Sequence, residues 1–431
     1  MFKTPNEPFA SLRDIYSQAK REFLESCTLC GQCLEICPVF PMTTFSDEDH
    51  SDIQQKLLDA LSGEVCEIAA EMAYACSGCD QCIGSCPIGL NPFSLKEILK
   101  EEVVNSGLRT PPGPLRIGDK VIDLQEMLGS LQMSPDQRPW LVGMPEKPVQ
   151  KDIVLFLGCS VRYQPDKGLA LIELMQMAGL DHVAIQGGEL CCGGMYVRDG
   201  DIDQGNVVAG KLISSLSAFR PGKVVFSCPS CYKRVNEILD TMDVKPFELQ
   251  YASALLSENL HRLKLRNRVE KTVTLHDPCD LRWKRKDSDA VRKLIGAIEG
   301  VTLKEMKHNR ECSLCCGIGS HDKDNHISNE LRTRVLDEAE ETGAHILATV
   351  CTGCHNHFCR AQNRYSYEIT HHLSLLAAAA GHHFEDKLKK YLQFETIDEI
   401  MEDAAQCIAK SPYSTEEFRK ILPIFFRSAR P

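Results

Sequence analysis

The sequence predicts an α/β protein in which an N-terminal α-helical ferredoxin-like domain precedes two tandem α/β cysteine-rich domains. Three observations predict this class. The 431 residues include 22 cysteines, most of them in clusters with regular spacing. The first two clusters lie among segments of helical periodicity. The later clusters follow short buried-strand patterns that alternate with helical patterns, and this whole segment occurs twice.

The composition excludes several classes of protein. The length suggests roughly three domains of about 150 residues each, and 43% hydrophobic residues with 25% charged residues are ordinary for a globular chain. Such a chain is too long to be a small disulfide scaffold, and its longest apolar run, residues 373–380, is much shorter than the roughly 18–20 residues of a bilayer helix. The net charge of −11 and the lack of a long basic stripe argue against nucleic acid as a partner. Because the first 26 residues show no secretory signal, we expect a cytoplasmic protein whose thiols bind metal.

Two cysteine motifs near the N-terminus have identical spacing, and each ends in Cys-Pro. Three thiolates with two residues between them can bind three corners of an iron–sulfur cube, while the fourth cysteine is carried to the other cube. We therefore expect two cubane [4Fe–4S] clusters. The cofactor-binding cysteines are Cys27, Cys30, Cys33 and Cys86 for one cluster, and Cys76, Cys79, Cys82 and Cys37 for the other. Two zinc sites are the alternative, since paired CxxC units also bind zinc, but the repeated proline argues against them.

Helical periodicity surrounds these two motifs. Residues 51–72 and 94–104 have apolar positions at helical spacing, which predicts a helical rather than a β-rich ferredoxin domain over residues 1–106. Cys66 is expected inside the first of these helices as a small buried side chain. Residues 107–150 contain many prolines and are predicted to be an ordered linker with a short helix near residues 117–131.

An internal repeat occupies residues 151–262 and 263–383, which we expect to be the first and second cysteine-rich domains. The strand patterns of the two copies are at residues 152–157, 182–185, 223–227, 272–275, 301–306 and 345–350. The helical patterns between them are at residues 168–178, 203–218, 290–298 and 326–342. Strands that alternate with helices predict a parallel sheet in each copy, and in such sheets sites form beyond the carboxyl ends of the strands, where the cysteines fall.

Each copy contains one cysteine, then a Cys-Cys-Gly pair, then a CxxC. The gap before the pair is 31 residues in the first copy and 35 in the second, and the gap after it is 35 and 34 residues. Five thiolates exceed what a tetrahedral zinc or a standard cubane requires, and an adjacent pair suggests that one sulfur bridges two irons of an unusual cluster. The glycine after each pair is expected to let the backbone approach the sulfide face.

These motifs carry a resemblance to a known family. The doubled CCG pattern resembles the cysteine-rich domains of the B-type subunit of heterodisulfide reductase, and the helical ferredoxin domain resembles its C-type subunit. Their fusion in this order resembles the D-type subunit of heterodisulfide reductase, and it is related to the iron–sulfur subunits of glycolate oxidase and anaerobic glycerol-3-phosphate dehydrogenase. The resemblance covers roughly residues 20–105 and 150–375.

The resemblance implies one non-cubane [4Fe–4S] cluster per copy, with a disulfide split between the two clusters and each sulfur captured by a cluster iron. The implied catalytic cysteines are Cys159, Cys191, Cys192, Cys228 and Cys231 in the first copy, and Cys279, Cys315, Cys316, Cys351 and Cys354 in the second. These ten and the eight cofactor-binding cysteines are the expected metal ligands. Zinc in place of one non-cubane cluster remains an open alternative.

Two functions follow as alternatives. The first is a disulfide reductase subunit that passes electrons through the cubanes to the non-cubane clusters, which reduce or form a thiol disulfide. The second is a non-catalytic conduit from a flavin dehydrogenase to a quinone or a membrane partner. Both CCG motifs are complete, which favours the first function.

Other redox cofactors are not expected in this chain. No GxGxxG follows a strand, so we expect no flavin or NAD site. Cys351 to His355 reads as CxxCH, but the repeat explains the motif and we expect no haem. The electrons must then come from other subunits. We expect a flavoprotein, a hydrogenase or dehydrogenase, or a membrane cytochrome or quinone subunit, together with a disulfide or thiol substrate.

The last segment, residues 384–431, is expected to be a separate helical tail. Basic residues stand beside apolar ones in residues 418–431, which allows peripheral association with a membrane surface or a membrane partner. The alternative is a helix that packs on its own chain or on a soluble partner. Pro423 is expected to break the helix.

Overall fold

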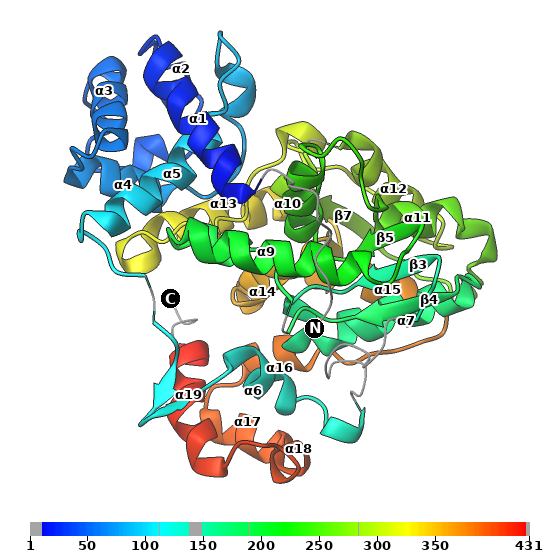
Figure 1. Cartoon of the computed structure of the whole chain (residues 1–431). Helices are drawn as coiled ribbons and strands as arrows, with labels where there is room; N and C mark the ends of the chain where they lie inside the picture. Colours follow the sequence, from blue (N-terminus) through cyan, green and yellow to red (C-terminus); the bar gives the residue numbers. More distant parts are fainter. Residues whose placement is uncertain (1–10, 112, 138–148, 189, 283, 428–431) are drawn as a thin grey trace.

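The computed structural model of the chain describes residues 11–111, 113–137, 149–188, 190–282 and 284–427. It contains an N-terminal helical domain, two α/β domains and a smaller helical lobe, shown at the upper left, centre and bottom of Figure 1. The predicted α/β class with a helical ferredoxin-like start is confirmed. Within the described residues, no helix is both long and apolar enough to cross a bilayer.

The N-terminal domain is built from helices. These are α1 (Leu12–Ser26), α2 (Gln32–Glu35), η1 (Phe40–Met42), α3 (His50–Leu61), α4 (Glu67–Ala75), η2 (Ile83–Ser85) and α5 (Pro92–Asn105). Helices α1, α3 and α4 pack against α5 around buried residues such as Ile53, Leu57 and Leu95. The expected single helix at residues 51–72 was wrong, because the chain turns at Gly63 and starts a new helix. Cys66 is therefore the N-cap of α4 rather than a residue inside a helix.

The first α/β domain has a parallel four-stranded sheet in the order β4-β3-β5-β6. Its strands are β3 (Ile153–Phe156), β4 (His182–Ile185), β5 (Lys223–Phe226) and β6 (Glu248–Tyr251). Its helices are η5 (Ser160–Arg162), α7 (Pro165–Met177), α8 (Gly194–Arg198), α9 (Ile202–Ser217), α10 (Pro229–Leu239), α11 (Ala252–Glu258) and η6 (Leu260–Arg262).

The second α/β domain repeats this topology, with the parallel order β10-β9-β7-β8. Its strands are β7 (Thr272–His276), β8 (Thr302–Leu303), β9 (Ile346–Thr349) and β10 (Glu368–His371). Its helices are η7 (Cys279–Leu281), α12 (Arg285–Gly296), η8 (Arg310–Cys312), η9 (Lys323–Asn325), α13 (His326–Glu341), α14 (Thr352–Cys359), η10 (Gln362–Arg364) and α15 (His372–Ala379). The predicted parallel repeat is confirmed. The sequence missed β6 and β10, which are edge strands with polar residues.

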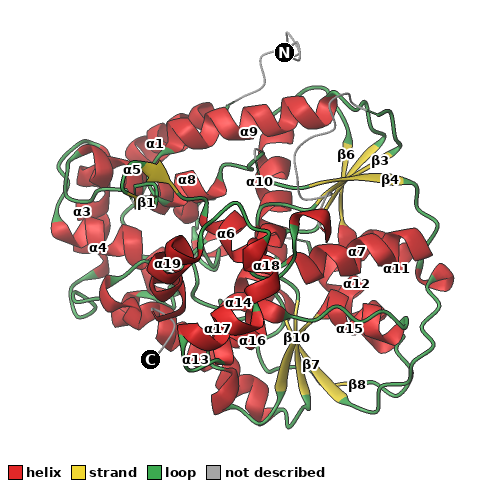
Figure 2. Cartoon of the chain, turned by 90° about the horizontal axis from the view of Figure 1, so that it is seen from below, coloured by secondary structure: helices red, strands yellow, loops and turns green. Residues whose placement is uncertain are grey.

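A layer of four helices joins the two repeats. Helix α11 of the first repeat packs against α12 of the second. Helix α7, which is equivalent to α12, packs against α15, which is equivalent to α11. Figure 2 shows these helices between the two sheets. At the same interface, the Ser253 hydroxyl donates a hydrogen bond to His372 Nε2 at 2.7 Å, and His372 Nδ1 donates to the Thr349 carbonyl at 3.2 Å. The neutral imidazole thereby joins α11 of one repeat to β9 of the other.

The linker and the tail form one lobe rather than two separate segments. The linker contributes β1 (Arg116–Ile117), β2 (Lys120–Val121), α6 (Leu124–Ser130) and η3 (Pro135–Gln137), and the tail contributes α16 (Lys387–Gln393), α17 (Ile397–Asp403), α18 (Ala405–Ala409) and α19 (Thr415–Arg427). They share a core that includes Met127, Tyr391 and Phe418. The predicted helix near residues 117–131 starts only at Leu124, because the β1–β2 hairpin comes first. Residues 138–148 of the linker lie outside the described residues.

The structure corrects the expectation for Pro423. The residue lies inside α19 instead of ending it. A proline inside a helix removes one backbone hydrogen bond, but the side chains of Phe418, Ile421 and Leu422 are buried in the core of the lobe, where α19 packs against α17. The apolar face of the tail thus packs on its own chain, which is the second of the two alternatives considered from the sequence.

The buried imidazole at the interface predicts a pH dependence of stability. Burial lowers the pKa of His372 to about 4, so the unfolded chain takes up a proton below pH ~6.5 while the folded chain does not. The free energy of unfolding therefore falls as the pH drops from about 6.5 to 4, and this one residue accounts for about 2 kcal/mol between pH ~7 and ~5. In anaerobic denaturant titrations at pH ~7 and ~5, His372→Gln should lose about 2 kcal/mol less than the wild type. The matched control His261→Gln, at an exposed position, should keep the wild-type dependence. Equal pH dependence in all three proteins would contradict the prediction.

Candidate iron–sulfur centres

The two cysteine motifs of the helical domain adopt the same loop conformation. Cys27 and Cys76 end α1 and α4. In each loop, the residue before the next cysteine and the residue after it have positive φ. These residues are Leu29 (+58°) and Gly31 (+69°) in the first motif, and Gly78 (+73°) and Asp80 (+61°) in the second. Left-handed residues in such turns direct successive N–H groups into an anion-binding concavity. Both loops therefore fit an anionic, sulfur-ligated cluster, and the left-handed leucine is a strain that an ordinary turn would avoid.

One thiol of the first motif, that of Cys37, lies beside the thiols of the second motif. Burial, together with the neighbouring thiols of Cys76 and Cys79, raises the pKa of the Cys37 thiol to about 12. Cys37 thus lies beside the second motif although it belongs to the first. Cys33 instead has Cys27 and Cys30 as its neighbours. This separation is what the expected ligand exchange requires of Cys37. Cys86, the other ligand that is expected to be exchanged, directly follows η2, which packs against α2 of the first motif.

The five cysteines of the first CCG motif meet beyond the carboxyl ends of β3, β4 and β5. The thiol of Cys192 hydrogen-bonds with those of Cys191 and Cys231, and Cys231 hydrogen-bonds with Cys228. Burial raises the pKa of the Cys159 thiol to about 12, with Cys228 and Cys192 as its charged neighbours. All five predicted sulfurs therefore form one connected group.

The second CCG motif gathers in the same way. Cys354 Sγ lies 3.2 Å from Cys316 Sγ, Cys279 hydrogen-bonds with Cys315, and Cys351 hydrogen-bonds with Cys354. Hydrogen bonds from Cys315 and Cys354 lower the pKa of the Cys316 thiol to about 6. The thiolate is the form that binds metal.

Among the described residues, no three Cys, His, Asp or Glu side chains are placed to hold one single metal ion.

The CCG glycines have a role that differs in part from the expected one. Gly193 (φ +83°) and Gly317 (φ +85°) are both left-handed, and the N–H of each donates to the first sulfur of its pair at 3.4 Å. A Cβ at Gly193 would lie 2.4 Å from the Gly205 carbonyl oxygen, and one at Gly317 would lie 2.6 Å from that of Ser328. The close approach is therefore between the loop and α9 in the first copy or α13 in the second, and the sulfur receives a hydrogen bond from the same glycine.

The two CCG sites face each other through reciprocal contacts. Beside the first cysteine of copy one, Ser160 Oγ accepts a hydrogen bond from Thr352 Oγ1 in the CxxC helix of copy two, at 2.6 Å. In the reverse direction, Ser230 Oγ in the CxxC of copy one donates to Asp280, beside the first cysteine of copy two. Each first-cysteine loop thus touches the CxxC of the other copy.

The second motif of the helical domain lies directly against the second CCG site. Cys315 Sγ is 3.7 Å from the Ser77 carbonyl oxygen, and a Cβ at Gly319 would lie 2.3 Å from that same oxygen. The Arg282 guanidinium donates to the carbonyl oxygens of both Cys79 and Ser313. The loop that carries Cys76 and Cys79 is therefore joined to the loop that carries Cys315.

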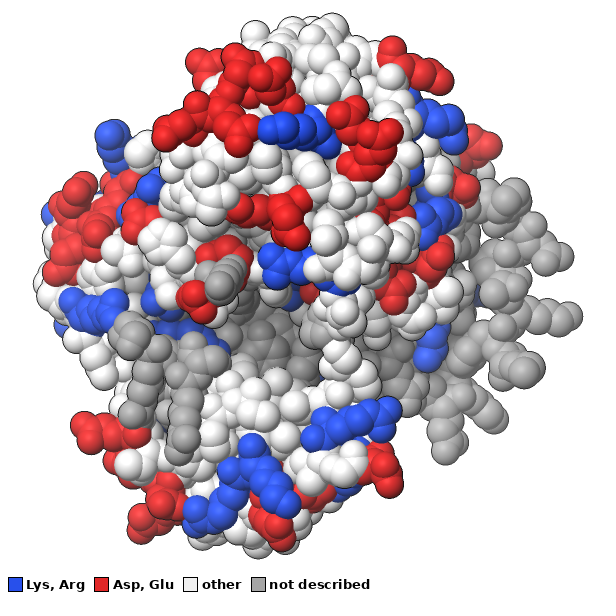
Figure 3. Space-filling model, turned by 90° about the vertical axis from the view of Figure 1, so that its left-hand side faces the viewer, with Lys and Arg blue, Asp and Glu red and all other residues white. Residues whose placement is uncertain are grey.

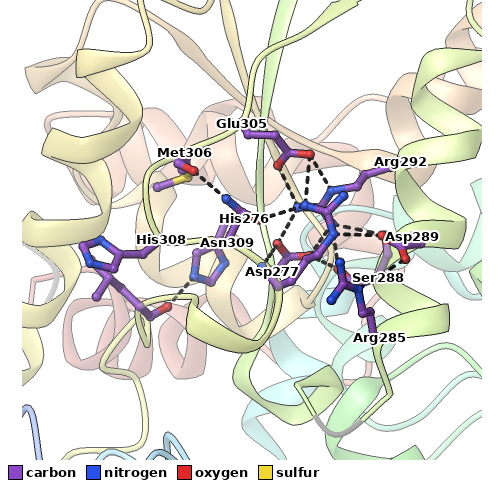
Figure 4. Close-up of polar contacts among 12 residues, drawn as sticks. His276, Asp277, Arg285, Ser288, Asp289, Arg292, Glu305, Met306, His308 and Asn309 are labelled. Carbon is purple, nitrogen blue, oxygen red and sulfur yellow. Dashed lines mark hydrogen bonds and ion pairs between the residues drawn. The ribbon is translucent and has the colours of Figure 1, made fainter.

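A buried polar network holds the loops of the second site in place (Figure 4). Arg292 binds Asp277 through two hydrogen bonds of 2.7 and 2.8 Å, and it also binds Glu305 at 2.7 and 2.8 Å. Burial would raise the pKa of Asp277, but the hydrogen bonds and charge of Arg292 outweigh it and hold the pKa below its usual value. His276 Nε2 donates to the Leu314 carbonyl at 3.0 Å. The network thereby fixes the residues just before Cys279 and Cys315.

His355, the histidine of the CxxCH motif, is fully engaged within the protein. Its Nδ1 lies 2.9 Å from Thr349 Oγ1 and its Nε2 lies 2.7 Å from Asp386 Oδ2. The same carboxylate is 2.5 Å from Lys167 Nζ, which is almost completely buried. Sequence reasoning missed Lys167 and Asp386, since neither lies in a motif and only the fold brings them to the second site.

Sequence reasoning also missed two buried lysines of α5, Lys96 and Lys100. Their one available signal was their place in the helical pattern at residues 94–104, where an ammonium group falls between the apolar positions.

Comparisons with known proteins agree with this arrangement. Residues 23–90 match the family described as "4Fe-4S dicluster domain", and residues 153–236 and 273–359 match the family described as "Cysteine-rich domain". The D-type subunit of the dihydromethanophenazine:CoB--CoM heterodisulfide reductase from Methanosarcina mazei is 26% identical, over 77% of this chain and 87% of the relative. One subunit of the fumarate reductase (CoM/CoB) from Methanothermobacter marburgensis is 24% identical, over 79% of this chain and 68% of the relative. A probable glycolate oxidase iron–sulfur subunit from Bacillus subtilis is 23% identical, over 77% and 87%.

Substitution of the CCG glycines should disrupt both the fold and the site. Gly193→Ala and Gly317→Ala combine backbone strain with a clash against a carbonyl oxygen, so each should lower the free energy of unfolding by about 3 kcal/mol or more and reduce the bound iron. Gly63→Ala is the matched control, since Gly63 also has positive φ (+100°) but no described atom lies within 4 Å of the added Cβ. It should cost about 1–2 kcal/mol and keep its iron. Denaturant titration and iron analysis measure both effects. Equal losses in the three variants would show that strain alone, and not the close approach, matters.

Proposed function

Because the chain is an iron–sulfur oxidoreductase subunit of the type that includes the D-type subunit of heterodisulfide reductase and the glycolate oxidase iron–sulfur subunit, we propose that its two CCG sites reduce, or in reverse form, a thiol disulfide. The observation that carries the proposal is the pairing of two complete five-cysteine groups, which face each other through reciprocal contacts. A disulfide has two sulfur atoms, so a pair of facing metal–thiolate sites matches its chemistry better than a single site does.

The eighteen motif cysteines would hold two cubane and two non-cubane [4Fe–4S] clusters, and these groups supply one-electron redox chemistry when bound. Reduction of a disulfide consumes two electrons and two protons, breaks the S–S bond and releases two thiols. The residues of this chain bring the thiolates of each site together and exclude water from them, since Cys192, Cys231, Cys316 and Cys354 are buried. Cys228 and Cys351 are the N-caps of α10 and α14, and the hydrogen bond with Cys231 lowers the pKa of the Cys228 thiol and so favours its thiolate form. Zinc in one CCG site remains the alternative occupant.

The electrons would enter at the first ferredoxin motif and leave through the second. Cys30 is exposed, and the exposed apolar residues Ile36 and Ile88 lie close to Cys37 and Cys86 in the sequence. Figure 3, in which the helical domain faces the viewer at the top, shows carboxylates gathered over this end of the molecule. A redox partner with a basic surface would fit this end. The second motif then touches the second CCG site through Ser77 and Gly319, which gives a short path onward.

Other redox subunits complete the proposed assembly. A flavoprotein, a hydrogenase or dehydrogenase, or a membrane cytochrome or quinone subunit would supply or receive the electrons in the cytoplasm. Contact with a membrane would come through such a partner, because Phe418, Ile421 and Leu422 of the tail helix are buried in the lobe. We assign residues 1–106 to the ferredoxin-like domain, and residues 151–262 and 263–383 to the CCG domains. The described residues of the linker 107–150 and of the tail 384–431 make the lobe.

A non-catalytic electron conduit is the second candidate. The resemblance to a probable glycolate oxidase iron–sulfur subunit favours it, as does the resemblance to an EtfAB:quinone oxidoreductase from Syntrophomonas wolfei, which is 22% identical over 69% of this chain and 48% of the relative. In a conduit, the CCG sites would relay electrons without binding a disulfide. In the first candidate, the CCG cysteines are needed to convert a disulfide into thiols. In the second, they are needed only for the passage of electrons.

A disulfide-reduction assay tests the proposal. Anaerobic protein would be given reduced methyl viologen as electron donor and a panel of low-molecular-weight disulfides, with release of thiols as the readout. We expect thiol release with at least one disulfide, and a loss of at least about 100-fold in Cys192→Ala and Cys316→Ala, since each variant removes one buried ligand of a facing pair. Cys407→Ala, in the tail lobe, is the matched control and should keep full activity. Oxidation of the viologen without thiol release from any disulfide would favour the conduit instead.

A further inference from the structure

Helix α5 buries two lysines on the face that it turns toward the cysteine motifs. Lys96 and Lys100 are 5% and 4% exposed, and they lie one turn apart on the same side of the helix. The neighbouring charged residue of the helix, Glu97, instead binds Tyr16 and Arg234, where α5 meets α1 and α10. Lysines are almost never fully buried unless their charge is compensated. The carboxylates of Glu97 and Asp199 also act on the charge of Lys100, so the ammonium group that still requires a counterion is that of Lys96.

The Lys96 ammonium has no hydrogen-bond partner among the described residues, although its nitrogen is inaccessible to solvent. Its charge is close enough to the thiols of Cys33, Cys37 and Cys82 to interact with all three. Cys33 belongs to the proposed first cubane site, whereas Cys37 and Cys82 belong to the proposed second. Lys96 is thus near both sites at once.

Lys100 is placed differently. Among the cysteines, its charge interacts with Cys76 of the proposed second site, and its ammonium lies 5.9 Å from the ring centroid of Tyr74. Tyr74 is next to the end of α4, two residues before Cys76. The two lysines therefore differ, since Lys96 is near thiols of both sites and Lys100 is near Cys76 of the second site.

We propose that Lys96 is a shared countercharge for the two cubane clusters and raises the reduction potentials of both. The inference rests on the proposed pair of cubanes. When bound, each cluster would supply one-electron redox chemistry in which no bond forms or breaks, and the thiolates of this chain would hold it. An added electron would bring one more negative charge to a site where four thiolates already contribute negative charge. A buried ammonium stabilises that extra charge strongly, because neither water nor salt screens the interaction. Net charge near a cluster is one of the factors that sets its potential.

A shared countercharge also suits the transfer of electrons between the two clusters. Because the same ammonium acts on both, it raises both potentials together and keeps them close to each other. Two separate surface lysines would be screened by salt, and the two reduction potentials would then change independently of each other with the salt concentration. Lys96 is a tuning residue in this proposal, and Lys100 adds to the potential of the second cluster only.

Redox titrations of four variants, followed by electron paramagnetic resonance of the reduced cubanes, test this proposal. Lys96→Met removes the charge and keeps the length of the side chain, Lys96→Arg keeps the charge, and Lys100→Met removes the neighbouring one. Lys56→Met is the matched control, because this ammonium pairs with Glu48 at the surface of the same domain. We expect Lys96→Met to make both clusters about tenfold harder to reduce, which corresponds to a downward shift of about 59 mV for a one-electron couple. Lys96→Arg and Lys56→Met should keep the wild-type potentials, and Lys100→Met should lower the second potential alone.

The outcomes separate this inference from the proposed function. Iron analysis of the wild type shows first whether two cubanes are present, and their absence would overturn the cofactor assignment itself. With full iron in Lys96→Met, unchanged potentials, or a shift in only one of them, would overturn the shared countercharge. If Lys96→Met loses its iron while Lys96→Arg keeps both iron and potentials, the positive charge is required for cluster assembly and the proposal stands. Loss of iron in both Lys96 variants would contradict a role that depends on charge.

Discussion

The thiols of each CCG site meet because three parallel strands of one sheet end at the same edge. The first cysteine, the adjacent pair and the CxxC each follow a different strand, and more than thirty residues separate them along the chain. A parallel sheet places the carboxyl ends of its strands together, so the order of elements alone brings five sulfurs to one place. The rest of the structure depends on this arrangement. The four-helix layer between the repeats turns the two edges toward each other, and the reciprocal contacts of Ser160 and Asp280 with the opposite copy follow from it.

The helical domain is held against the α/β domains by buried charges. Arg234 of the first repeat binds Glu97 at 2.7 Å and also binds Tyr16, while Lys233 binds Asp80 of the second ferredoxin loop and lies 3.8 Å from Asp280 of the second repeat. Buried ion pairs of this kind contribute little net stability, but the removal of one partner is costly. They fix the orientation of three domains at one junction. At that junction the second ferredoxin loop meets the second CCG site. These charges therefore hold the position of the loop relative to the site, on which the proposed electron transfer depends.

Much of this architecture was predictable from sequence, because cysteine spacing and strand–helix alternation are local patterns. The parallel repeats and the helical ferredoxin-like domain follow from such patterns, and the proximity of Cys37 to Cys76 agrees with the exchange inferred from spacing. The errors have physical reasons. A turn at Gly63 divides a helix whose apolar spacing continues across it, and the packing of Phe418 and Leu422 holds a helix through Pro423. Lys96, Lys167 and Asp386 could not be recognised, because their importance arises only from the tertiary contacts that bury their charges.

Mössbauer spectroscopy of anaerobic, 57Fe-enriched protein, oxidised with and without thiols and combined with iron and zinc analysis, is the most direct test of the central claim that this chain carries two cubanes and two facing thiol-reactive sites. We expect about sixteen irons per chain, four in each of four clusters, with only the half bound by the CCG cysteines responding to thiols. About eight irons, or zinc in the CCG sites, or spectra that thiols leave unchanged, would contradict disulfide chemistry in this chain.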